Sequence, residues 1–230
     1  MRYRCCLPIL ATLLAPPTVF AARPLVTDDA RLTDARACQM ESWFHIHHDS
    51  TELWALPACN PGGNFELTIG EALSRAAGHT DNNGAFLIQG KTLFKPLETN
   101  GYGVGLAVGY STELGSGEGR SAYFYVPTSI SFANDRFVLH TNLGAVRELE
   151  GATTRLTWGI GSETQTTDRL FIIAETYGQN KGSPFFQMGL RYWIIPNHVQ
   201  LDTTFGSQIG HLHDARWVSI GLRLITPPLF

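Results

Sequence analysis

Strict two-residue alternation of apolar with small or polar side chains is the feature that most limits the fold of this chain. From Tyr102 to Tyr110, apolar side chains take the even positions and glycine or alanine the odd ones, with a tyrosine at each end. A transmembrane strand needs about 9–11 residues, an apolar outward face and aromatic side chains near both interfaces. This stretch meets all three conditions, and residues 184–194 and 216–225 repeat the alternation. The pattern therefore predicts strands that cross a membrane.

Clusters of Gly, Asn, Asp and Pro, which favour turns for backbone reasons, divide the chain into twelve such segments. An even number suits a single-chain bacterial barrel, and closure leaves no unpaired edge in lipid. The predicted fold is all-β: a closed antiparallel up-and-down transmembrane β-barrel of about twelve strands, spanning 38–230. The predicted strands are 38–47, 51–60, 64–76, 84–94, 102–113, 122–132, 136–147, 153–163, 169–178, 184–194, 198–207 and 216–225.

The first residues are predicted to be an export signal. Arg2 and Arg4 precede a mostly apolar run, and Val19 and Ala21 are small residues spaced for signal-peptidase cleavage. We expect a signal peptide over 1–21 and a periplasmic N-terminal segment over 22–37. Beyond the signal peptide, no stretch is apolar for 18 residues, so the sequence predicts no helical span.

Charge and export together indicate the environment. Without the two arginines of the signal, 15 basic residues face 20 acidic ones, which disfavours a nucleic-acid partner. The predicted location is the outer membrane of a Gram-negative bacterium, with both termini periplasmic. The expected partners are the lipid bilayer, lipopolysaccharide and the outer-membrane assembly machinery. The chain ends on the aromatic Phe230, which is typical of such barrels, although Pro227 and Pro228 end the last strand near residue 225.

Two cysteines test the register of the first hairpin. With a turn near residues 48–49, the cross-strand partner of Cys38 is Cys59. An oxidising compartment permits a disulfide between them, whereas the alternative is two free thiols.

If the apolar residues face lipid, the residues of opposite parity face the lumen. This set carries both signs of charge, with three arginines forming a positive side, and it fits either the wall of a narrow pore or a hydrogen-bonded filling. The predicted lumen-lining residues are Glu41, His45, His47, Glu66, Lys91, His140, Arg155, Arg191, Asp202 and Arg223, together with Gln89, Asn142 and Gln187.

The histidines are weak candidates for a metal site. His45 and His47 share a strand face, and His211 and His213 repeat that spacing in the last outer loop. Two imidazoles so placed can hold a transition metal, but a full ligand set is not visible in the sequence. The sequence therefore predicts neither a metal nor a cofactor.

Catalysis is also not predicted. A barrel hydrolase needs a serine and a histidine near the outer rim, with an orienting amide or acid. His140 and Asn142 share the inward face, but Ser129 and Ser131 lie near the periplasmic turn at 133–135, and no G-x-S-x-G occurs.

Residues 23–30 read Arg-Pro-Leu-Val-Thr-Asp-Asp-Ala, and a strand rich in Glu and aromatics follows at 39–44. This opening, with the Gly turn at 61–63 and the strand at 65–70, resembles a family of outer-membrane barrels named for the MetA pathway of phenol degradation. The resemblance implies a transporter-like barrel that passes small hydrophobic or aromatic compounds. Within the opening, Thr27 to Asp29 allow either a calcium site or a segment that tucks into the barrel mouth.

The predicted function is a passive channel or facilitator for small molecules. The alternative is a structural or adhesive barrel with a filled lumen that acts through its outer loops.

Overall fold

The computed structural model describes residues 25–77, 82–114 and 119–229; the predicted signal peptide lies outside them. In this described part of the chain, no helix is both long and apolar enough to cross a membrane. The strands are β1 (Cys38–His47), β2 (Ser50–Cys59), β3 (Phe65–Ala76), β4 (Asn82–Lys95), β5 (Tyr102–Leu114), β6 (Ser121–Phe132), β7 (Phe137–Glu148), β8 (Thr154–Gln165), β9 (Leu170–Gln179), β10 (Phe185–Ile195), β11 (Val199–Gln208) and β12 (Trp217–Ile225).

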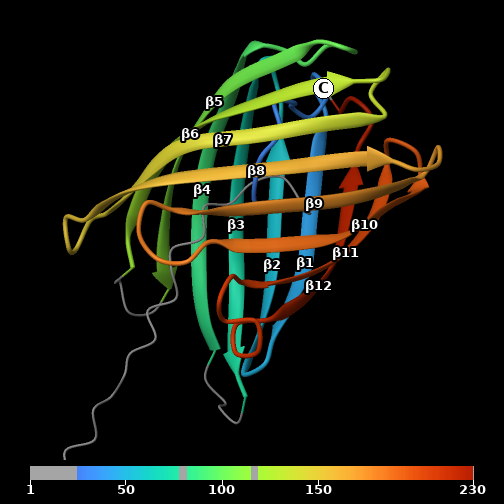
Figure 1. The fold of residues 1–230 in the computed structure, drawn as a ribbon. Helices are drawn as coiled ribbons and strands as arrows, with labels where there is room; N and C mark the ends of the chain where they lie inside the picture. Colours follow the sequence, from blue (N-terminus) through green and yellow to red (C-terminus); the bar gives the residue numbers. More distant parts are fainter. Residues whose placement is uncertain (1–24, 78–81, 115–118, 230) are drawn as a thin grey trace, which may run out of the picture.

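The twelve strands close into a barrel (Figure 1). Each strand pairs antiparallel with the next, and β1 pairs with β12 from Gln39 opposite Ile225 to His47 opposite Trp217. Closure gives every strand two neighbours, which satisfies the backbone where no water is available. The predicted fold class and strand number are confirmed. We call the end that holds the start of β1 and the end of β12 the periplasmic end, and the opposite one the outer end.

One strand begins earlier than the sequence predicts. The sequence predicts a strand from residue 84, after an Asn-containing turn, but β4 begins at Asn82, which pairs with Arg75 of β3. The ladder between neighbouring strands outweighs the turn preference of the asparagines, because each paired residue satisfies backbone groups that would otherwise stay open.

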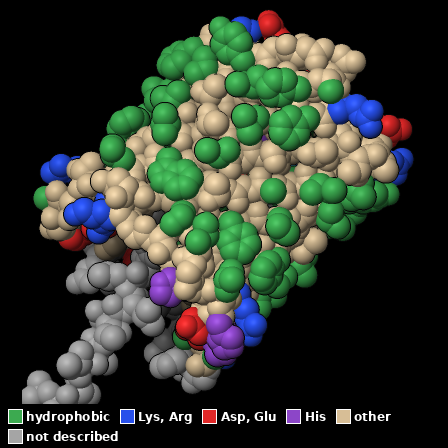
Figure 2. Space-filling view, viewed as in Figure 1, with side chains coloured by type: hydrophobic (Ala, Val, Ile, Leu, Met, Phe, Trp, Pro, Cys, Tyr) green, Lys and Arg blue, Asp and Glu red, His purple; other side chains and the backbone are tan. Residues whose placement is uncertain are grey.

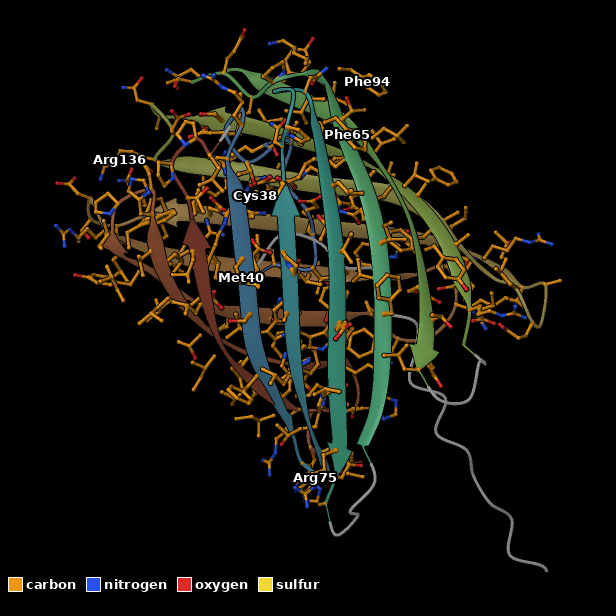
Figure 3. The ribbon with its side chains drawn as sticks, turned by 180° about the vertical axis from the view of Figure 1, so that it is seen from behind. Cys38, Met40, Phe65, Arg75, Phe94 and Arg136 are labelled. Carbon is orange, nitrogen blue, oxygen red and sulfur yellow. A yellow bond between two sulfur atoms is a disulfide. The ribbon has the colours of Figure 1, made fainter. Side chains whose placement is uncertain are left out.

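The alternating side chains of the strands give the barrel an apolar outer surface and a polar inner surface. On β1, Met40 and Phe44 are 40% and 50% exposed, whereas Glu41 is 3% exposed. Figure 2 shows hydrophobic side chains spread over the strand surface, and Figure 3 shows Phe65 and Phe94 near the periplasmic end of this belt. An apolar belt on a closed barrel is what a bilayer accommodates. Belt and fold together confirm the predicted outer-membrane location.

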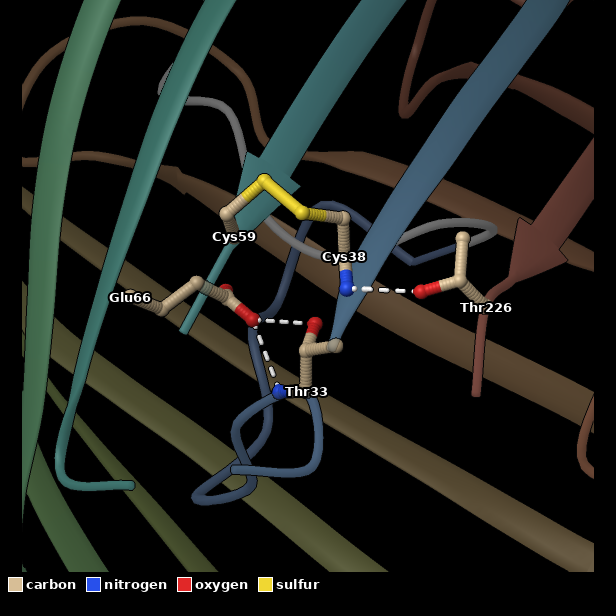
Figure 4. Close-up of a disulfide and its surroundings, with 5 residues drawn as sticks. All are labelled: Thr33, Cys38, Cys59, Glu66 and Thr226. Carbon is tan, nitrogen blue, oxygen red and sulfur yellow. Dashed lines mark hydrogen bonds between the residues drawn. A yellow bond between two sulfur atoms is a disulfide. The ribbon is translucent and has the colours of Figure 1, made fainter. Parts of the chain in front are cut away.

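The predicted disulfide is confirmed. Cys38 and Cys59 lie opposite each other in the β1–β2 ladder, with their Cα atoms 4.0 Å apart, and their sulfurs are bonded (Figure 4). The amide of Cys38 also donates to Thr226 Oγ1 at 3.0 Å, just beyond the end of β12. The disulfide therefore lies where the first and last strands meet at the periplasmic end.

The segment before β1 occupies the lumen. Residues 22–37 are predicted to be periplasmic, but the described part, 25–37, runs inside the barrel, and Leu25, Asp28 and Ala30 are at most 4% exposed. We call residues 25–37 the plug. Inward side chains fill an eight-stranded barrel, whereas twelve strands enclose a wider lumen with room for a chain segment.

Candidate functional site

The site is the polar inner wall of the barrel together with the plug. The ladder register places all ten predicted lumen-lining residues on inward positions. Six of them are less than a tenth exposed: Glu41, Glu66, Lys91, His140, Arg191 and Asp202. The partly exposed Arg223 lies 3.3 Å from Glu41. His45 and His47 lie near the outer end of β1, and Arg155 lies at the outer end of β8, 3.9 Å from Glu148.

Glu175 of β9 holds the inner tip of the plug. Its two carboxylate oxygens accept the amides of Val26 and Thr27 at 2.6 and 2.7 Å, and Gln187 of β10 donates to the same group. A carboxylate that accepts backbone amides in a buried setting makes stronger bonds than a neutral acceptor does. Glu175 therefore fixes the depth to which the plug enters.

Asp28 of the plug bonds to several residues of the barrel wall. Its carboxylate lies 2.8 Å from Lys91 Nζ and accepts the hydroxyl of Tyr125 at 2.8 Å. With its amide in the orientation that these partners require, Asn142 accepts the Asp28 amide at 2.7 Å and donates to the Asp28 carbonyl at 3.0 Å. The cation at Asp28 is thus a lysine of the wall, which favours the tucked-in segment over a calcium site.

A second charged cluster surrounds Glu163 of β8. Arg191 Nη1 lies 2.6 Å from one of its oxygens, and Arg31 of the plug lies 3.4 Å from the other. Arg31 also bonds Asp29, its neighbour on the plug, at 3.3 Å. Opposite charges of the plug and the wall therefore lie next to each other, and they attract each other strongly because little solvent is present.

Ser129 and His140 face each other across the β6–β7 ladder. Ser129 Oγ is 2.8 Å from His140 Nδ1, and His140 Nε2 is 3.6 Å from Glu163 Oε1. A serine, a histidine and an acid in line resemble a hydrolytic triad. Here, however, the serine is fully buried and accepts the amide of Ala30 at 2.8 Å, so it positions the plug.

At the periplasmic end, Glu66 and Asn60 hold the root of the plug, and Figure 4 shows the bonds from Glu66 to Thr33. Glu66 Oε2 accepts the amide and the hydroxyl of Thr33 at 2.7 and 2.5 Å. Asn60 donates to the Thr33 carbonyl at 2.7 Å, and its own backbone pairs with Arg36 and Ala37. The plug is therefore anchored at its root, in the middle and at its tip.

Two glycines of β8 make room for the plug. A Cβ atom at Gly159 would lie 2.5 Å from Thr27 Oγ1, and one at Gly161 would lie 3.2 Å from Leu25. Both glycines point inward, so the wall is thinnest where the plug tip lies against it.

A cavity of about 520 Å³ lies beside the root of the plug. Arg31, Leu32 and Asp34 of the plug line one side, and Phe171, Trp193 and Arg223 of the barrel line another. This volume suits a small solute. The cavity lies at the periplasmic end, because β10 and β12 end among its lining residues.

Aromatic side chains line the lumen beside the plug and further toward the outer end. Trp43 and Trp54 stack with ring centroids 5.6 Å apart, and Tyr123 and Tyr125 stack at 6.3 Å. All four are less than a tenth exposed. The inner wall therefore presents aromatic surfaces as well as charged groups.

The sequence reasoning missed two wall residues that hold the plug. Glu163 and Glu175 were not among the predicted lumen residues, yet both are inward and almost fully buried. Strand parity could have found them, because Glu163 shares the face of Gly159 and Gly161, and Glu175 shares that of Ile173. The plug itself has no periodic pattern that would show where it lies.

The family model described as "Uncharacterised conserved protein UCP029691" matches residues 9–225, which is nearly the whole chain. The chain belongs to this family. A search of curated proteins found no match. The resemblance to the barrels of the MetA pathway stays a prediction.

Solved structures with a similar fold are porins. The KdgM porin matches with a TM-score of 0.62 and 7% identity, over 81% of this chain and 98% of that one. The NanC porin matches with a TM-score of 0.59 and 8% identity, over 84% of this chain and 100% of that one. Identities this low show a shared fold, that of outer-membrane porin barrels.

Proposed function

We propose that this barrel is an outer-membrane channel for small solutes, held closed by residues 25–37 and opened when they leave the lumen. The observation that carries the proposal is the chemistry of the plug contacts. Plug and wall meet mainly through ion pairs and hydrogen bonds, at Glu66, Lys91, Glu163 and Glu175. Water can replace partners of this kind when the segment withdraws, so an open state exposes little apolar surface.

The barrel does not depend on the plug for its ladder. Every strand has both neighbours without any contribution from residues 25–37, since β1 begins at Cys38. Withdrawal therefore costs the contacts of one segment and leaves the membrane-spanning sheet closed. A two-state element of this kind is what a gate requires.

The inner wall favours solutes with an apolar or aromatic part as cargo. A similar porin, KdgM, was solved in complex with disordered oligogalacturonate, with a TM-score of 0.63 and 8% identity over 81% of this chain. Here, however, Lys91, Arg191 and Arg223 each lie within 3.3 Å of a carboxylate, so their charge is already matched. The stacked tryptophans and tyrosines instead offer planar surfaces on which aromatic rings stack.

A structural barrel with a permanently filled lumen is the second candidate. The anchoring of the plug at its root, middle and tip, by Glu66, Lys91 and Glu175, favours it, because all three sets of contacts must break together before the lumen opens. In this case the outer loops would carry the function.

Conductance in planar bilayers tests the proposal. The refolded mature chain is compared with a variant that lacks residues 22–32 and so loses the tip and middle of the plug but keeps Thr33 and Arg36 at its root. We expect rare openings from the intact chain and sustained conductance, blocked by small aromatic solutes, from the variant.

Heat-modifiable migration on a gel first checks that both proteins are folded barrels. A deletion variant that folds but does not conduct would refute the channel proposal and favour the permanently filled barrel. Sustained conductance from both proteins would refute the gate. Open channels that aromatic solutes fail to block would refute the cargo class alone.

A further inference from the structure

A second polar cluster lies at the outer end of the barrel, away from the plug. His45 and His47 project inward from β1, and Glu52 lies opposite His45 on β2. His45 Nδ1 is 3.8 Å from Glu52 Oε2, and His47 Nε2 is 3.9 Å from Glu52 Oε1. One donor atom from each of the three side chains falls within 4.8 Å of the others.

These separations are too long for hydrogen bonds and are close to the distances between donor atoms that share one metal ion. Donors at about 2.0–2.2 Å from one zinc ion, in tetrahedral geometry, lie roughly 3.4 Å from each other. The two histidine–glutamate distances, 3.8 and 3.9 Å, would shorten by about 0.5 Å on metal binding, and no donor pair would close by more than about 1.4 Å. Among the described residues, the Nε2 atoms of His45 and His47 have no hydrogen-bond partner and are shielded from solvent.

Neighbouring side chains fix the orientation of the three donors. Trp54 Nε1 donates to Glu52 Oε2 at 2.9 Å, and Trp54 itself stacks on Trp43. The ring of Trp217 on β12 meets the His45 ring edge to face at 5.2 Å. Metal ligands in proteins are commonly held in this way by a shell of hydrogen bonds and packing.

The place of Trp217 depends on a glycine. A Cβ atom at Gly206 of β11 would lie 2.3 Å from the Trp217 ring. The tryptophan therefore lies flat against a wall position without a side chain, and its edge reaches the histidines. Three strands, β1, β2 and β12, thus build the site and its support.

We propose that His45, His47 and Glu52 form a binding site for one divalent transition-metal ion of the zinc class at the outer mouth of the lumen. Two imidazoles and one carboxylate suit zinc, nickel or copper and do not suit calcium or magnesium, which prefer oxygen donors. Three protein donors leave at least one position open to water or to a solute in the mouth. The site is independent of the proposed gate.

Calorimetric titration of the refolded chain, without a histidine tag, with zinc chloride tests this site. We expect one ion per chain, and at least about tenfold weaker binding in His45→Ala, His47→Ala and Glu52→Gln. Trp54→Phe keeps every donor but removes the bond to Glu52, and should weaken binding by about tenfold as well.

Other histidines provide the matched controls. His48→Ala, one residue beyond the site and exposed, and the double variant His211→Ala/His213→Ala in an exposed loop should bind zinc as the parent does. Absence of binding to the parent chain would overturn the proposal. So would binding that survives His45→Ala/His47→Ala or that is lost in the loop variant. Heat-modifiable migration confirms that each variant is a folded barrel.

Discussion

Replacing Asp28 with Asn should loosen the plug by an amount that the structure allows us to estimate. Lys91 Nζ lies 2.8 Å from Asp28 and 3.5 Å from Asp29, and the Asp28 and Lys91 side chains are 1% and 3% exposed. Removing one partner of a buried ion pair costs about 3–5 kcal/mol. Because Asp29 remains beside Lys91, we expect the lower end, about 3 kcal/mol.

This cost falls on the closed state alone. With the plug withdrawn, Lys91 faces a water-filled lumen and needs no partner. A difference of about 3 kcal/mol therefore raises the ratio of open to closed barrels by roughly a hundredfold. The measurement is the open probability of single channels in planar bilayers, at one voltage and one salt concentration, for parent and variant.

A second substitution separates charge from packing. Lys91→Met alone leaves Asp28 buried without its cation, and should also raise the open probability. The double variant Asp28→Asn/Lys91→Met buries no unmatched charge at this pair and should open less often than either single variant. Equal open probabilities in parent and Asp28→Asn, or additive effects in the double variant, would refute the reasoning.

Three further outcomes are expected. Gly159→Val puts side-chain atoms where Thr27 lies and should raise the open probability, while Gly62→Val, in a turn with open space around its Cβ, should not. Cys38→Ser should lower the urea midpoint of the barrel by the equivalent of about 2–4 kcal/mol, measured by tryptophan fluorescence. Hydrogen bonds from the Ser131 and Thr99 hydroxyls lower the pKa of Asp135, in the turn between β6 and β7. A group with a depressed pKa stabilises the fold above its ordinary pKa and loses this effect as the pH falls through the depressed value. Asp135→Asn should therefore lower the urea midpoint at pH 7 and have no effect in strong acid.

The barrel could be predicted because its signal is repeated twelve times. Each strand must present one face to lipid and the other to the lumen, so the period of two appears wherever the chain crosses the membrane. The pairing of Cys38 with Cys59 follows from the same regularity, since one turn position sets the register of the whole hairpin. Strand parity likewise placed Lys91 and Arg191 on the inner wall.

The contacts inside the lumen could not be predicted, because they depend on pairs far apart in the sequence. Ser129 and His140 meet only because β6 and β7 pair in one particular register, and a shift of one residue would separate them. The plug has no periodicity, and its bonds reach wall residues up to 149 positions away, as between Val26 and Glu175. Only the positions of the strands around it show that the segment lies inside.

The polar character of the plug favours a gate over a permanent filling of the lumen. Twelve strands enclose more space than their inward side chains fill, so either a chain segment or water has to occupy the lumen. A filling that never moves is served at least as well by apolar packing, because replacing buried ion pairs with apolar groups is often neutral or stabilising. This plug instead carries Asp28, Asp29 and Arg31 against Lys91 and Glu163. Burying charges on both plug and wall costs free energy in the closed state, whereas water solvates the same charges in the open state. The free energies of the two states therefore come within the few kcal/mol over which a gate can work.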